Sequence, residues 1–292
     1  MPLEAWTILK ILNWTTAYFR SYHIEEPRAD AEILLAHTLS TQRINLYLDY
    51  DRPLEPKELE GFKGLIRRRL QREPVAYIVG KKGFRSLNLK VTPDVLIPRP
   101  ETETLVEAAL AIIPVGPSAE PMRILDLGTG SGAVILALAS ERAGHIFYAV
   151  DRSENALAVA RDNARKYGIE HSITFLQGHW FEAVHDRERR FHLIVSNPPY
   201  ISHSDFDRLA PEILQYEPRE ALDGGPEGLD AIRLIIKKAG DYIIPGGWLV
   251  FEIGHDQRAS VEKLIAASGA YTDFRVLKDY SGLDRVVRAR AK

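Results

Sequence analysis

The chain has 292 residues, of which 45% are hydrophobic and 27% charged, and its formal net charge at pH 7 is −2. This is the composition of an ordinary globular protein that can bury a full core, in one large domain or in one large and one small domain. The absence of cysteine excludes disulfides, thiolate zinc sites, iron–sulfur clusters and a cysteine nucleophile. The charge balance does not favour non-specific binding of nucleic acid.

The first residues, MPLEAWTILKILNW, include the acidic Glu4 and contain neither a basic leader nor a small-residue cleavage site. We therefore expect no signal peptide. No apolar run approaches the roughly 18 residues that a membrane-spanning helix requires. These features predict a cytoplasmic protein with no membrane partner.

Residues 1–74 are predicted to form a small helical domain. Three apolar stripes have helical spacing, and they consist of Ile8, Ile11, Leu12 and Phe19, of Ala31, Leu34, Leu35 and Leu39, and of Leu59, Phe62, Ile66 and Leu70. Glu26-Pro27 and Arg52-Pro53 fit short connections between helices. A basic cluster at Arg67–Arg69 and Arg72 is interpreted as a solvated helix face rather than as a contact for RNA or a protein.

Residues 75–98 are predicted to form a β-hairpin linker. Two short extended runs, 76–80 and 87–91, flank Gly83 and Ser86. Pro98 and Pro100 then exclude a helix interior, so the next helix should begin near Glu101.

Residues 99–292 are predicted to form an α/β domain with a mostly parallel sheet. Buried-strand patterns at 123–127, 146–150, 191–196 and 248–253 alternate with helical patterns at 133–142, 153–167 and 231–239. The last two strands, 273–277 and 285–289, are joined by a loop too short for a crossover helix and must pair antiparallel. A parallel sheet that ends in an antiparallel hairpin is typical of the class I methyltransferase (Rossmann-like) fold.

A glycine-rich loop, Gly128-Thr129-Gly130-Ser131-Gly132, follows a predicted strand and opens a helix. Its glycines allow a sharp turn and the close approach of a ligand to main-chain N–H groups. Asp151 ends the next strand, where a carboxylate can accept hydrogen bonds from both hydroxyls of a ribose. The glycines also fit a simple tight turn, Asp151 also fits a helix cap near Ser153, and the loop alone does not distinguish an adenosyl sulfonium from a dinucleotide.

Trp180 follows a predicted strand at 173–177, where the next loop would cross the cofactor crevice. We expect its ring to pack on or beside an adenine. The alternative is an ordinary core tryptophan.

The tetrapeptide Asn197-Pro198-Pro199-Tyr200 directly follows the apolar strand 191–196. Its two prolines stop the strand and stiffen the loop, which leaves two acceptors, the side-chain oxygen of Asn197 and the main-chain oxygen of Pro198. Both acceptors can hold the N–H bonds of an amide, a poor nucleophile, while the ring of Tyr200 lies flat against the planar group. Such positioning of reactants is worth on the order of 7–11 kcal/mol. A structural turn is the alternative interpretation of the four residues.

With these motifs the sequence resembles the PrmC/HemK family of protein-glutamine N5-methyltransferases over nearly the whole chain. The resemblance extends to segments that generic methyltransferases lack, which are Tyr77-Ile78 with Gly80, Phe84 and Leu87; 97–103; 217–219 with 221–225 and Gly228-Leu229; 252–254; and 284–287.

The resemblance implies transfer of a methyl group from S-adenosyl-L-methionine to N5 of the glutamine in the Gly-Gly-Gln motif of class I peptide chain release factors. It implies that Gly128–Gly132, Asp151 and Trp180 line the cofactor, that Asn197 touches both cofactor and substrate, and that Pro198, Pro199 and Tyr200 hold the substrate glutamine. The helical domain would dock the release factor. His179 replaces a commonly acidic residue before Trp180, which puts the usual contact to the adenine amino group in doubt.

Other functions fit parts of the pattern. The closest alternatives are a glutamine methyltransferase acting on a ribosomal protein and an N6-adenine nucleic-acid methyltransferase, although direct binding of nucleic acid is not expected because the chain is slightly acidic. A nicotinamide oxidoreductase and a non-catalytic adapter fit less of the sequence. The nine histidines show no metal-ligand spacing, so no metal is predicted.

Overall fold

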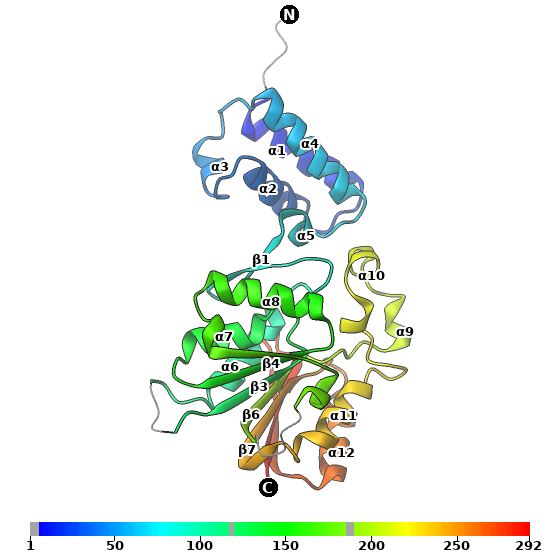
Figure 1. Ribbon diagram of the computed structural model, residues 1–292. Coiled ribbons are helices and arrows are strands. Elements are labelled where there is room, and N and C mark those ends of the chain that lie inside the picture. The colour runs from blue at the N-terminus through cyan, green and yellow to red at the C-terminus, as the bar shows by residue number, and fades with distance from the viewer. Residues whose placement is uncertain (1–5, 117–119, 185–189) are drawn as a thin grey trace, which may run out of the picture. The chain divides into compact units, whose positions relative to one another are not determined.

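The computed structural model describes residues 6–116, 120–184 and 190–292, and it divides into two compact units (Figure 1). The first, the helical unit, contains the chain up to Gly80 together with Ala210–Tyr216. The second, the sheet unit, contains Lys81–Leu209 and Glu217–Lys292.

The helical unit is built on the three apolar stripes. Its helices are α1 (Ile8–Ser21), α2 (Pro27–Thr38), α3 (Asn45–Leu48), α4 (Pro56–Leu70), α5 (Val75–Val79) and α10 (Pro211–Tyr216). The larger members of each stripe, such as Phe19, Leu35 and Phe62, are fully buried in one cluster. Pro27 and Pro56 stand at the starts of α2 and α4, where a missing N–H leaves no helical hydrogen bond unmade.

The expected strand at 76–80 is wrong. Residues 75–79 are the helix α5, whose first hydrogen bonds run from the N–H groups of Tyr77 and Ile78 to the carbonyl of Pro74. Burial of Ile78 in the core of the helical unit favours this helix, and Gly80, at φ +70°, ends it. The hairpin lies later in the chain, as β1 (Lys81–Phe84) paired antiparallel with β2 (Leu87–Lys90).

The basic cluster on α4 is also not the solvated face that was expected. The Arg69 side chain is only 7% exposed and joins two carboxylates, with Nε 2.7 Å from Asp30 and Nη2 2.9 Å from Glu212 of α10. Arg72 donates to the carbonyl of Tyr22 and pairs with Glu212. Arg69 therefore ties α2, α4 and α10 into one unit.

The sheet unit contains seven strands in the order β5-β4-β3-β6-β7-β9-β8. They are β3 (Arg123–Leu127), β4 (Ile146–Asp151), β5 (Ile173–Gln177), β6 (Phe191–Ser196), β7 (Ile243–Glu252), β8 (Tyr271–Lys278) and β9 (Asp284–Ala291). The first five pair in parallel, whereas β9 is antiparallel to both β7 and β8. The predicted class I methyltransferase fold with its terminal antiparallel hairpin is confirmed.

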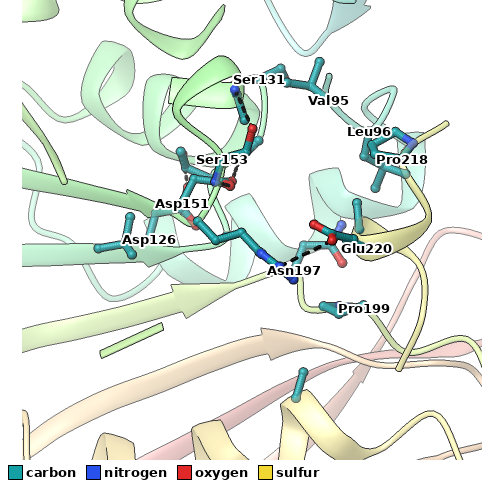
Figure 2. A pocket seen from close by; sticks show the side chains of 18 of the residues that line it. Val95, Leu96, Asp126, Ser131, Asp151, Ser153, Asn197, Pro199, Pro218 and Glu220 are labelled. Carbon is teal, nitrogen blue, oxygen red and sulfur yellow. Dashed lines mark hydrogen bonds and ion pairs between the residues drawn. The ribbon is translucent and has the colours of Figure 1, made fainter. Parts of the chain in front are cut away.

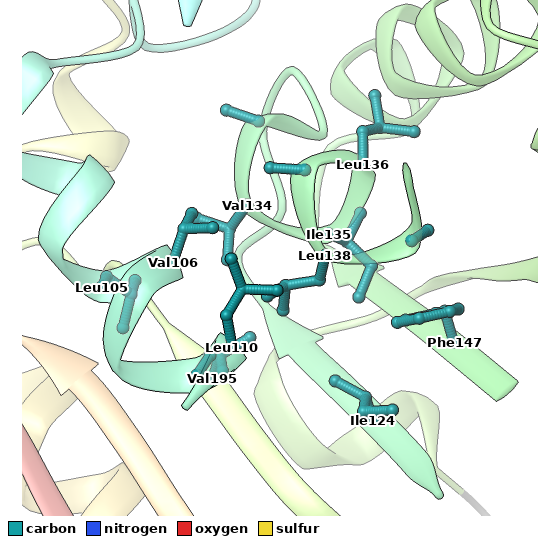
Figure 3. Close-up of a cluster of buried hydrophobic side chains, with 14 of the residues drawn as sticks. Leu105, Val106, Leu110, Ile124, Val134, Ile135, Leu136, Leu138, Phe147 and Val195 are labelled. Atoms are coloured by element: carbon teal, nitrogen blue, oxygen red, sulfur yellow. The ribbon is translucent and has the colours of Figure 1, made fainter. Parts of the chain in front are cut away.

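Helices cover both faces of this sheet (Figure 1). One core contains residues of α6 (Glu103–Leu110), α7 (Ala133–Glu141) and α8 (Glu154–Lys166), and the other contains residues of α11 (Asp230–Ala239) and α12 (Arg258–Ser268). Successive residues of β6 alternate between the cores: Leu193 and Val195 belong to the first, which Figure 3 shows, and Ile194 belongs to the second. No helix within the described residues is both long and apolar enough to cross a membrane.

Replacement of Arg69 by alanine should destabilise the helical unit. Asp30 and Glu212 would be left as poorly solvated carboxylates without their cation, a change that costs about 3–5 kcal/mol. Hydrogen exchange of the α2 and α4 amides in the full chain measures this loss. The matched control is Arg67→Ala, since Arg67 is exposed on the same helix. Equal exchange rates in the two variants would contradict the bridging role of Arg69.

Candidate active site

A cavity of about 360 Å³ lies in the sheet unit beyond the carboxyl ends of β3, β4 and β6 (Figure 2). The loops that follow these strands contribute Gly128–Ser131, Asp151–Ser153 and Asn197 to its lining. Clefts at this edge of a parallel sheet are where α/β proteins bind ligands. The cavity size is within the range of small-molecule sites.

The glycine loop follows β3 and is fastened to β4 by its own main chain. The N–H groups of Gly128 and Thr129 both donate to the carbonyl of Val150, each at 2.9 Å. Gly132 has φ +83°, and a Cβ there would lie 2.9 Å from Cδ1 of Leu136. The positive φ therefore favours glycine at 132, and a side chain there would also require Leu136 to shift.

Asp151 holds this loop against the start of α8. Its Oδ2 accepts from the N–H of Gly130 at 2.8 Å and its Oδ1 accepts from the N–H of Ser153 at 2.9 Å. The N-cap of α8 is Ser153, whose hydroxyl accepts from the N–H of Ala156. Burial raises the pKa of Asp151, and the main-chain N–H groups of Ser153 and Gly130 oppose that rise. Each carboxylate oxygen has a second lone pair, so Asp151 retains acceptors at the cavity.

Asp126 is a second carboxyl group in the lining, and it is almost completely buried, with 1% of its surface exposed. Burial raises its pKa to about 7, while the hydroxyl of Thr129, 2.7 Å away, and a main-chain N–H oppose that rise. The carboxyl group therefore titrates close to neutral pH.

Trp180 lies in the cavity lining and also packs against the second core of the sheet unit. Its backbone has φ +53°, a strained conformation for a residue with a large side chain. A Cβ at Gly128 would lie 3.6 Å from its ring, so the loop and the indole ring pack closely. Gly178 permits the turn before Trp180, because a Cβ there would lie 2.7 Å from Cβ of Ala183. His179 also lines the cavity.

The tetrapeptide Asn197–Tyr200 begins where β6 ends. Asn197 and Pro199 line the cavity, whereas Pro198 and Tyr200 are not part of that lining. The hydroxyl of Ser196 donates to the carbonyl of Leu127 at 2.8 Å and fixes the strand end beside the glycine loop. The structure therefore brings Asn197, Asp151, Trp180 and Gly128–Ser131 around one cavity, whereas Gly132 is not part of its lining.

A polar network behind the tetrapeptide is a feature that the sequence interpretation missed. Nδ2 of Asn197 donates to Oγ1 of Thr102 at 3.2 Å, and Thr102 donates to Oε2 of Glu252 at 2.8 Å. The hydroxyl of Tyr200 donates to Oε1 of the same carboxylate at 3.0 Å. Glu252 is completely buried at the end of β7. The sequence indication for this network was Glu252, a charged residue at the end of an apolar strand.

Asn163 was missed as well. It is a fully buried amide on α8, and its Nδ2 donates to the carbonyl of Ser131 at 2.9 Å. The same side chain accepts from the N–H and donates to the carbonyl of Lys90. Asn163 therefore links the glycine loop to the hairpin β1–β2. The sequence indication for this role was a polar residue on the apolar face of a predicted helix.

The charge of the lining is mostly negative. Six carboxyl groups and two guanidinium groups contribute to it, and these residues are Asp94, Asp126, Asp151, Glu220, Asp223 and Asp230, with Arg99 and Arg152. Arg99 lies 2.5 Å from Glu217, and Arg152 pairs with Glu220. Within the described residues, no group of three or more His, Asp or Glu side chains converges as a metal site would require. Asp223 and Asp230 also pair with Arg219 and Arg233, which lie outside the lining, so part of this negative charge is compensated.

Comparison with known proteins agrees with this fold. Residues 10–80 match the PrmC N-terminal domain and residues 118–249 match a methyltransferase domain. A release factor glutamine methyltransferase of Geobacter sulfurreducens is 43% identical over 287 residues, 98% of either chain. One of Coxiella burnetii is 45% identical over 264 residues, 90% of this chain and 92% of its own.

A solved methyltransferase from Pyrococcus furiosus shares the fold, with a TM-score of 0.53 and 17% identity, over 77% of this chain and 96% of its own. The protein is thus an enzyme of the class I methyltransferase type. It belongs to the release factor glutamine methyltransferase family.

The buried carboxyl group of Asp126 should make stability depend on pH. Its pKa rises from 3.8 to about 7 on folding, so the folded state binds the additional proton between these values. The free energy of unfolding should therefore fall as pH rises from about 4 to about 7, by on the order of 4 kcal/mol.

Asp126→Asn should lack this pH-dependent part of the free energy of unfolding. Urea unfolding across the pH series measures the difference. Asp273→Asn, which removes an exposed carboxylate of the same unit, is the control. The same pH dependence in the wild type and in Asp126→Asn would contradict the assignment.

Proposed function

We propose that this enzyme transfers the methyl group of S-adenosyl-L-methionine to N5 of the glutamine in the Gly-Gly-Gln motif of class I release factors. The observation that carries the proposal is Asn197, which lies in the lining of the cavity with its Nδ2 engaged by Thr102. Its Oδ1 is therefore left to accept from an N–H group in the cavity. The names of the relatives support a glutamine side chain as the source of that group.

The glycine loop supports an adenosyl sulfonium over a dinucleotide. A pyrophosphate needs free main-chain N–H groups, but those of Gly128, Thr129 and Gly130 already donate to Val150 and Asp151. The carboxylates of the lining would also repel a pyrophosphate, whereas they attract a cation. The residues of the cavity therefore fit S-adenosylmethionine.

In this proposal Asp151 accepts hydrogen bonds from the ribose hydroxyls and the ring of Trp180 packs on or beside the adenine. The residues Gly128–Gly132 form the wall of the cofactor site. When bound, S-adenosylmethionine supplies an electrophilic methyl group on a good leaving group.

The tetrapeptide would then hold the substrate amide. Oδ1 of Asn197 and the main-chain oxygen of Pro198 accept from the two N–H bonds, which raises the electron density at nitrogen and orients its lone pair. The ring of Tyr200 lies against the amide plane, and Pro199 stiffens the loop. Orientation of this kind is worth on the order of 7–11 kcal/mol and requires no strong general base.

Methylation of adenine in nucleic acid would use the same acceptors, but it requires phosphates near the site. The two guanidinium groups of the lining, those of Arg99 and Arg152, already pair with Glu217 and Glu220 and are not free to bind a phosphate. We propose instead that the predicted helical domain, residues 1–74, docks the release factor. Since release factors act in translation, the enzyme would work in the cytoplasm.

Asp151→Ala should weaken the binding of S-adenosylmethionine. Loss of a charge-assisted contact costs about 1.5–3 kcal/mol, which is roughly a 10- to 150-fold rise in Kd measured by calorimetry. Glu154→Ala, an exposed acid in the first turn of α8, is the control and should bind normally. An unchanged Kd for Asp151→Ala would remove this residue from the cofactor site.

Substrate choice is tested with methyl-labelled S-adenosylmethionine, a class I release factor and duplex DNA in one reaction. Label should appear on the release factor alone, and a release factor with asparagine in place of the Gly-Gly-Gln glutamine should remain unlabelled.

Asn197→Ala should abolish transfer while its Kd for the cofactor stays near the wild-type value, because it removes an acceptor for the amide. Label on DNA alone, or normal turnover by Asn197→Ala, would refute the proposal.

A further inference from the structure

We propose that Thr102 and Glu252 are positioning residues that fix which end of the Asn197 amide faces the substrate. This inference rests on the proposed function, in which Asn197 must offer an oxygen and not an NH2 group. An asparagine amide turned by half a rotation would present two donors to the N–H bonds of the substrate, and those contacts would be repulsive.

The hydrogen bonds of this network all run in one direction, from Asn197 through Thr102 to the buried carboxyl group of Glu252. The hydroxyl of Thr102 donates to Oε2 of Glu252 and the hydroxyl of Tyr200 donates to Oε1, so both carboxyl oxygens of Glu252 act as acceptors. The oxygen of Thr102 then has lone pairs left, and Nδ2 of Asn197 donates to it. The hydroxyl hydrogen that would otherwise bind Oδ1 of Asn197 is thus already engaged.

The pKa of the Glu252 carboxyl group is raised, although three neighbouring groups act against the rise. Burial raises its pKa, and the hydrogen bonds from Thr102 and Tyr200 and the charge of Arg285 oppose that rise. Arg285 is held nearby by Asp279 and by the carbonyl of Ile253. Each oxygen of Glu252 therefore accepts from one hydroxyl, and the guanidinium group of Arg285 lies close.

The same carboxylate also fixes the other end of the tetrapeptide. Its Oε1 accepts from the hydroxyl of Tyr200, and this hydrogen bond fixes the orientation of the Tyr200 ring. The main-chain oxygen of Tyr200 accepts from Gln257, so the residue is held at both ends. One buried side chain thus sets the first and the last residues of Asn197–Tyr200.

The decisive variant is Thr102→Val, which keeps the shape of the side chain and removes the hydroxyl. Asn197 would lose its acceptor, so both orientations of its amide would be populated. The kcat/KM for release factor methylation should fall about 10- to 100-fold, while the Kd for S-adenosylmethionine stays within about twofold of the wild-type value. Thr102→Ser, which restores the hydroxyl, should recover most of the activity.

The matched control is Thr104→Val, the same substitution two residues away. Thr104 is also buried, and its hydroxyl has no hydrogen-bond partner among the described residues. It should keep wild-type kcat/KM. Equal losses in the Thr102 and Thr104 variants, or no rescue by serine, would show that only packing matters and would overturn the inference.

A second readout does not depend on the substrate. In the ¹⁵N-labelled free protein, the side-chain NH2 of Asn197, assigned through Asn197→Asp, should exchange slowly in the wild type and in Thr102→Ser. Its exchange should be at least about tenfold faster in Thr102→Val, and equal exchange would refute the inference. An inactive wild type with this exchange pattern would instead refute the proposed substrate and leave the positioning role standing.

Discussion

The parallel register of β4, β3 and β6 decides where Gly128, Asp151 and Asn197 lie. Leu127 pairs with Val150 on one side and with Ser196 on the other, so these three residues form one row across the sheet. The next residue in each strand's chain is Gly128, Asp151 or Asn197. Three segments that are far apart in the sequence therefore emerge side by side, and the cavity forms where they diverge (Figure 2).

The main-chain N–H groups of the loop after β3 bind the rest of the protein and not a phosphate group. Its first main-chain N–H groups are used by Val150 and Asp151, which fixes the loop to β4 before any ligand arrives. Asn163 fastens the far end of the loop through Ser131. The first main-chain N–H groups of the loop are therefore not available to a phosphate group.

Local patterns in the sequence predicted the parts of the fold that local forces decide. The strands at 123–127 and 191–196 and the antiparallel end of the sheet were predicted correctly, because apolar runs and loop length determine them. The strand expected at 76–80 failed because burial of Ile78 in the helical unit overrides its β-branched composition. The pairing of Thr102 with Glu252 joins residues 150 positions apart, and no local pattern encodes it. The roles of the site residues stay predictions.

The most direct measurement is a crystal structure of the enzyme with S-adenosylhomocysteine and a peptide that contains Gly-Gly-Gln. The amide nitrogen of the peptide glutamine should lie about 2.9 Å from Oδ1 of Asn197 and from the main-chain oxygen of Pro198. It should also face the sulfur of the spent cofactor. An amide bound elsewhere, or one that meets Nδ2 of Asn197, would contradict the proposed chemistry.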